Sequence, residues 1–143
     1  MMLIKKLTIF LMVINPILMN AQSEMIFNGI HLEDSLEKVT QRIREISDTS
    51  KLIAIDNPTF PLARDKEDHL VCTQVKTDNG LIERVVFTFA DNKLTYIEAR
   101  GNAYETFVGK RSDTARTYLD YEVYPKDKLF LKKEKDIAWI IHG

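Results

Sequence analysis

The chain of 143 residues contains one cysteine, Cys72, and only five glycines and four prolines. A single cysteine excludes a disulfide within the chain. Because free cysteine is among the most often buried residue types, we expect Cys72 to lie in the core; a disulfide between two chains stays the alternative. The glycines are scattered, so no glycine cluster of the kind that holds phosphate is present. A standard nucleotide-binding loop is therefore not expected.

An excess of charge of either sign is also lacking, since 20 basic residues stand against 21 acidic ones. Surfaces that bind nucleic acid usually have a clear excess of basic residues. Nucleic acid is therefore not an expected partner. The chain also lacks the G-x-S-x-G turn that presents a nucleophilic serine. No catalytic constellation is evident, and the sequence predicts no cofactor.

Only one long hydrophobic run is present, at the N-terminus. Residues 1–21 combine two lysines, an apolar stretch and a small residue at the end, which is typical of a cleaved signal peptide. Asn15-Pro16 interrupts the run before it reaches the roughly 20 apolar residues of a spanning helix, so a retained membrane anchor is the less favoured alternative. We expect an exported protein, periplasmic or extracellular, without lipid at Cys72. Residues 22–143 are expected to form one domain without a transmembrane span.

The remaining chain predicts an α+β fold, in which an N-terminal amphipathic helix packs on an antiparallel β-meander. Asp34, with Glu37 three residues later, has the pattern of a capping box at the helix start. A narrow apolar stripe follows and is expected to pack on the sheet. The stripe consists of Leu36, Val39, Ile43 and Ile46.

The stretch Leu81–Arg100 predicts the central β-hairpin, with Asp91-Asn92 as its turn. Val85, Phe87 and Phe89 share one face of the first arm; Leu94 and Tyr96 are expected to share a face of the second. Alternation or apolar runs predict further strands at 51–56, 69–76, 118–124, 129–132 and 137–142. The last of these is apolar on both faces, so it is expected to be central or covered on both sides.

The segment Gly101–Thr117 has no clear pattern, and its role stays open. A short helix at Tyr104–Val108 and a second one capped by Ser112 or Asp113 are compatible with it. One helix followed by a meander in a small exported protein resembles SmpA/OmlA-type and β-lactamase-inhibitor-like modules, on the strength of the helix Leu32–Ile46 and the hairpin Val85–Ile97. The lipid-attachment cysteine of the first group is absent, and no binding residues are carried over.

Two groups of residues are candidate sites. Carboxylates beside an imidazole are ligands of divalent ions, so the stretch Asp65, Glu67, Asp68 and His69 suggests a metal-dependent hydrolase. A solvated charged loop is the alternative. In the segment 118–124, read as one strand, alternate residues place tyrosines beside carboxylates, as protein interfaces favour. That predicted binding face consists of Tyr118, Asp120, Glu122, Tyr124 and Phe130.

The leading interpretation is a non-catalytic module that binds another protein or a component of the cell envelope. Alternatively, a helix from elsewhere in the chain covers the tyrosines of the predicted binding face, which would then be part of the core. A metal-dependent hydrolase and a carrier of a small apolar ligand are the alternative functions. The sequence fixes neither the partner nor the oligomeric state.

Overall fold

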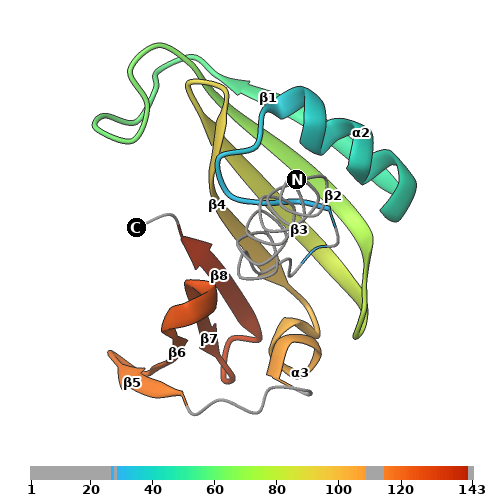
Figure 1. The fold of residues 1–143 in the computed structure, drawn as a ribbon, viewed down its shortest axis with the longest axis vertical. Coiled ribbons are helices and arrows are strands. Elements are labelled where there is room, and N and C mark those ends of the chain that lie inside the picture. The colour runs from blue at the N-terminus through green and yellow to red at the C-terminus, as the bar shows by residue number, and fades with distance from the viewer. Residues whose placement is uncertain (1–26, 28, 109–114, 142–143) are drawn as a thin grey trace, which may run out of the picture.

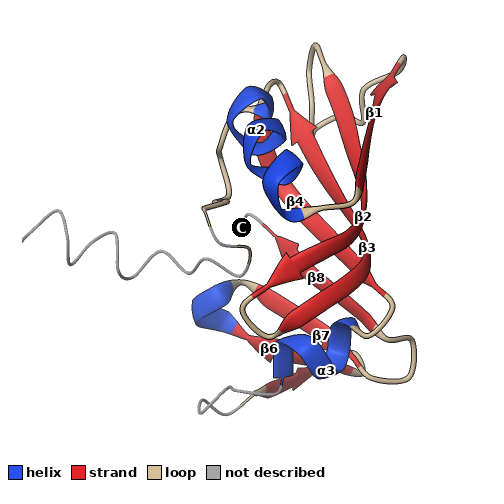
Figure 2. Ribbon diagram, turned by 90° about the vertical axis from the view of Figure 1, so that its right-hand side faces the viewer, coloured by secondary structure: helices blue, strands red, loops and turns tan. Residues whose placement is uncertain are grey.

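The computed structural model describes residues 27, 29–108 and 115–141, which form one sheet and short helices (Figures 1 and 2). The elements in chain order are helix α2 (Leu36–Ile46), strands β1 (Thr49–Ile55), β2 (Glu67–Thr77), β3 (Gly80–Ala90) and β4 (Lys93–Arg100), helix α3 (Ala103–Val108), strands β5 (Arg116–Tyr118) and β6 (Tyr121–Tyr124), the 3₁₀ turn η1 (Pro125–Asp127), and strands β7 (Leu129–Lys132) and β8 (Ile137–Ile141).

All neighbouring strands of the described sheet are antiparallel, in the order β1-β2-β3-β4-β8-β7-β6-β5. The predicted α+β class with an antiparallel sheet is confirmed. A single continuous meander is wrong, because the chain leaves β4 through α3 and re-enters the sheet at the far edge strand β5. The last strand, β8, then lies between β4 and β7, as its two apolar faces predicted.

The hairpin of β3 and β4 turns at Asp91-Asn92, as predicted, and both turn residues have positive φ, +50° and +67°. Its register shifts after Thr88, which pairs with Tyr96, while Phe89 pairs with Leu94. Thr95 is therefore an extra residue in β4, a β-bulge. The expected common face of Leu94 and Tyr96 is wrong for this reason.

One face of the sheet, here called the inner face, carries the core. Val85, Phe87 and Phe89 share this face, as predicted, and are fully buried on it; after the bulge Leu94, Ile97 and Ala99 are buried too. Val39, Ile43 and Ile46 of α2 and Ala103 and Phe107 of α3 belong to the same buried cluster. Figures 1 and 2 place α2 near one end of the sheet and α3 near the other. The opposite side is called the outer face.

Helix α2 begins one residue later than predicted. Ser35 is the N-cap, and its hydroxyl accepts a hydrogen bond from the Lys38 N–H at 3.2 Å. Asp34 instead accepts from the His31 N–H at 2.8 Å and pairs with the Lys38 ammonium at 3.2 Å. The predicted capping box of Asp34 and Glu37 is therefore wrong, although the buried stripe that follows is as expected.

Cys72 lies on β2 and is fully buried, as predicted, and burial raises the pKa of its thiol to about 12. The short helix expected at Tyr104–Val108 is α3. The expected signal peptide, residues 1–21, and the helix start at Ser112 or Asp113 lie outside the described residues. None of the helices within the described ranges is long and apolar enough to cross a membrane.

Candidate functional site

The four residues of the predicted metal site do not converge. Glu67 and His69 share the outer face of β2, where the Glu67 carboxylate lies 2.8 Å from Nε2 of His69. Asp68 points to the opposite side, is 2% exposed, and lies 3.4 Å from the Lys66 ammonium. In the described part of the chain, no three His, Cys, Asp or Glu side chains are placed to hold a metal ion. The expected grouping is therefore wrong.

The loop before β2 instead wraps around a carboxylate of the protein itself. The backbone N–H groups of Arg64, Asp65 and Lys66 donate to the Asp91 carboxylate at 2.9, 2.8 and 3.0 Å. The Asp91 N–H donates in return to the Lys66 carbonyl at 2.8 Å. These donors lower the pKa of Asp91, because they stabilise its charged form. The loop thus presents donors to an anion, which is the reverse of a cation site.

Glu67 anchors the same loop from the other side. Its carboxylate accepts a hydrogen bond from the Thr59 N–H at 2.8 Å. This bond, together with the His69 contact, lowers the pKa of Glu67, although burial acts in the opposite direction.

Thr88 lies opposite His69 on β3, and no partner for its hydroxyl is found among the described residues. A threonine, a histidine and a glutamate in a row resemble a nucleophile with its base, but Thr88 is 1% exposed and is closed to a substrate.

The predicted binding face is divided by a turn. The expected strand 118–124 is two strands, β5 and β6, joined by Leu119-Asp120, and both turn residues have positive φ. Tyr124 is 5% exposed and belongs to the core. Glu122 accepts the Tyr104 hydroxyl at 2.7 and 2.8 Å, which raises the pKa of Tyr104 to about 12. The common face expected for these residues is therefore wrong.

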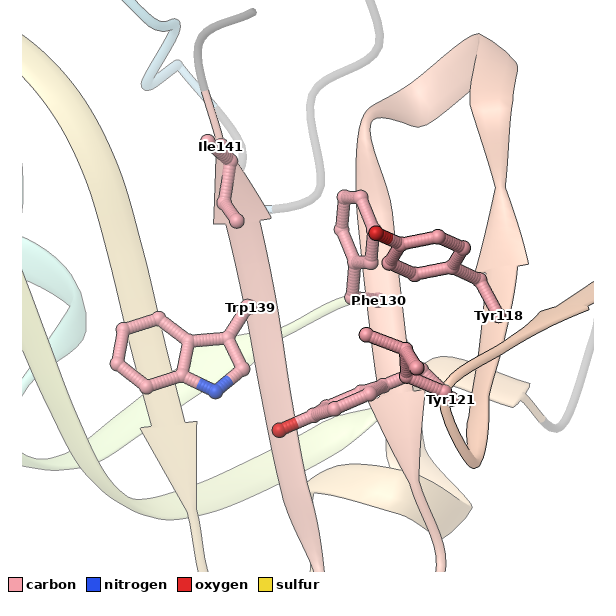
Figure 3. A pocket seen from close by; sticks show the side chains of 6 residues that line it. Tyr118, Tyr121, Phe130, Trp139 and Ile141 are labelled. Atoms are coloured by element: carbon pink, nitrogen blue, oxygen red, sulfur yellow. The ribbon is translucent and has the colours of Figure 1, made fainter.

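Tyr118 and Phe130 do come together, in a group that the sequence did not predict. A hollow of about 370 Å³ opens on the outer face, across the hairpin of β5 and β6 and strands β7 and β8 (Figure 3). We call it the aromatic hollow. Its lining residues are Tyr118, Leu119, Tyr121, Phe130, Trp139 and Ile141.

Three of the four aromatic side chains that line the hollow contact another aromatic ring. The rings of Tyr121 and Phe130 meet edge to face, with centroids 6.4 Å apart, and the Lys132 ammonium lies 5.4 Å from the Tyr121 centroid. The ring of Trp139 packs beside that of Tyr96, with centroids 5.7 Å apart. In Figure 3 the Trp139 ring points away from Phe130.

The hollow is also exposed to solvent, since Tyr118 is 61%, Leu119 73% and Ile141 39% exposed. Sequence reasoning missed Tyr121 and Trp139. Two-residue hairpin turns with positive φ usually contain Asn, Asp or Gly, so Leu119-Asp120 gave only half of the usual signal. Without that turn, Tyr121 was assigned to the face opposite Tyr118, whereas the two are cross-strand partners.

No protein-family model matches this chain, and neither a curated protein nor a solved structure shows significant similarity to it. The function must therefore be inferred from the site itself. An exposed, mainly apolar hollow with aromatic walls offers area for contact with an apolar partner.

Proposed function

We propose that the chain is a small exported domain that performs no catalysis and binds another protein of the cell envelope through the aromatic hollow. The observation that carries the proposal is the hollow itself, in which the exposed Tyr118 and three half-buried aromatic side chains gather on a sheet face. Tyrosine and tryptophan are enriched among the residues that contribute most to protein interfaces. Contiguous exposed apolar patches commonly mark such interaction sites.

Export is proposed from residues 1–21, which have the layout of a signal peptide. In the proposed mature domain, α2 packs on the inner face through Val39, Ile43 and Ile46. That packing leaves the outer face to the partner. The proposal that the domain does no catalysis is supported by the engagement of the polar residues near Asp91 and Glu67 within the protein.

A matched pair of exposed aromatic residues tests this proposal. Tyr118 lies in the hollow and is 61% exposed, whereas Phe60 lies in the loop before β2 and is 77% exposed. Cells that express the tagged protein are cross-linked, and the captured envelope proteins are quantified for wild type, Tyr118→Ala and Phe60→Ala. We expect a partner that Tyr118→Ala loses and Phe60→Ala retains. Equal capture by both variants would contradict the proposed site.

A second candidate is the carriage of a small apolar ligand. The volume of about 370 Å³ favours it, because pockets for small molecules start near 300 Å³ and are mostly apolar. Native mass spectrometry of the protein purified from its own cell decides this point. A bound mass that is released on denaturation and absent from Trp139→Ala would favour the carrier; the bare chain alone would count against it.

A further inference from the structure

A second hollow on the outer face borders the aromatic one. It has a volume of about 280 Å³ and is lined by Arg84, Val86, Glu98 and Arg100. Arg84 of β3 and Arg100 of β4 are direct cross-strand partners. Side chains at such positions have Cβ atoms about 5 Å apart, and like charges placed there repel each other. An anion between the two guanidinium groups would reduce this repulsion.

The carboxylate of Glu98 compensates only part of this charge. It pairs with Nε of Arg100 and is 22% exposed. That contact leaves the two terminal nitrogens of Arg100 without a partner in the part of the chain that the structure describes. Arg84 is exposed, and no hydrogen bond or ion pair within the described ranges engages its guanidinium group. A guanidinium presents donors in a planar fork that matches the oxygens of a carboxylate.

The register of the strands places these cations beside the aromatic hollow. Arg84, Arg100, Ile137 and Lys132 form one cross-strand row. The next row on the same face consists of Val86, Glu98, Trp139 and Phe130. Rows two residues apart along a strand are separated by roughly 7 Å. An oxyanion held by the arginines would thus lie about one side-chain length from the Trp139 ring.

We propose that Arg84 and Arg100 form a carboxylate-binding subsite of the aromatic hollow. The segment that docks there carries an acidic group next to an aromatic or apolar side chain. The apolar group enters the hollow beside Trp139, and the carboxylate is held by the two guanidinium groups. This inference rests on the proposed function, because the occupant is a segment of the partner protein.

The test uses a small probe that carries both groups. The isotope-labelled protein is titrated at low salt with N-acetyl-phenylalanine and, separately, with its neutral amide, while the Arg Nε–H and Trp139 indole signals are followed by NMR. We expect the acid to shift the signals of Arg84, Arg100 and Trp139 together, and the amide to shift that of Trp139 alone. The acid should bind the double variant Arg84→Gln/Arg100→Gln about tenfold more weakly. Lys51 lies on β1, on the same outer face of the sheet as the two arginines. Lys51→Gln is therefore the control and should leave the affinity for the acid unchanged.

Equal binding of the acid and the amide, binding of the acid that survives the double substitution, or no shift with either probe would overturn the subsite. The failure of the subsite can be told apart from that of the proposed function by capturing the partner with the double variant. Capture at the wild-type level would leave the proposed function standing and reject the subsite. A wild type that captures no partner would reject the proposed function, while the comparison of acid and amide would still decide the subsite.

Discussion

The loop before β2 and the aromatic hollow differ in how much of their binding capacity is already used within the protein. In the loop, the donors of Arg64, Asp65 and Lys66 and the carboxylate of Asp91 satisfy one another. In the hollow, aromatic and aliphatic surface stays in contact with solvent, although the rings of Tyr121 and Phe130 contact each other. The comparison teaches that a cluster of charged residues in a sequence can be paired off within the fold, whereas a contiguous exposed apolar patch marks a surface where a partner can bind.

The largest expected effect is a difference in stability between substitutions on the two faces of β7. Leu131 is fully buried on the inner face of β7, and its neighbour Phe130 lines the hollow. Leu131→Ala should lower the free energy of unfolding by about 2–5 kcal/mol, because it leaves a cavity in the core. Phe130→Ala should cost clearly less stability and should weaken capture of the partner. Denaturant unfolding of both variants measures the difference, and equal losses would mean that the hollow is part of the core.

The next effect concerns the loop before β2. Asp91→Ala removes the acceptor of three backbone N–H groups, so it should lower the unfolding temperature and speed hydrogen exchange at residues 64–66. Asp65→Ala is the matched control, since only the backbone N–H of Asp65 takes part in these bonds. If Asp65→Ala were as damaging as Asp91→Ala, the loop would depend on the Asp65 carboxylate, as the metal-site prediction required.

A smaller effect concerns pH. The pKa of Glu67 is lowered in the folded state, chiefly by the Thr59 N–H. Its contribution to stability is therefore complete above the pKa of an unfolded glutamate and is lost as the pH falls through the lower, folded value. Thermal unfolding between neutral and acidic pH should show Glu67→Gln to be less stable than wild type at neutral pH. The gap between the two should close as the solution is acidified; a gap that widens with acid would contradict the direction of this pKa shift.

The smallest expected effect is that of divalent ions. Because Asp68 and Glu67 lie on opposite sides of β2, zinc, calcium or manganese should not raise the unfolding temperature. Differential scanning calorimetry with each ion measures this. A rise that disappears in His69→Ala would restore the metal-dependent alternative.

Much of the first half of the fold was readable from local patterns. Strict alternation placed Val85, Phe87 and Phe89 on one face, which the structure shows to be the buried one, and Asp91-Asn92 marked the turn. The bulge at Thr95 was not readable, because no residue type there announces an extra position. The pairing of β8 with β4 joins segments far apart in the chain, so the apolar run at 137–142 predicted a central strand but not its neighbours.

For the candidate sites too, local patterns could be predicted from the sequence, whereas contacts between distant segments could not. Tyr118 and Phe130 of the predicted face do line one hollow, but the turn at Leu119-Asp120 reassigns Tyr121 to their face and places Glu122 against Tyr104 of α3. The role of Asp65–His69 was decided by Asp91, which lies 26 residues along the chain from Asp65. Such long-range hydrogen bonds leave no trace in local spacing.

The most direct test of the central claim is a site-specific photo-cross-link. A benzophenone amino acid replaces Tyr118 in the hollow and, in a separate strain, Phe60 in the loop. The account predicts a discrete cross-linked envelope protein from position 118, absent from position 60 and weakened by Trp139→Ala. Cross-linking only from position 60, or from neither position, would contradict the proposal that the aromatic hollow is the binding site.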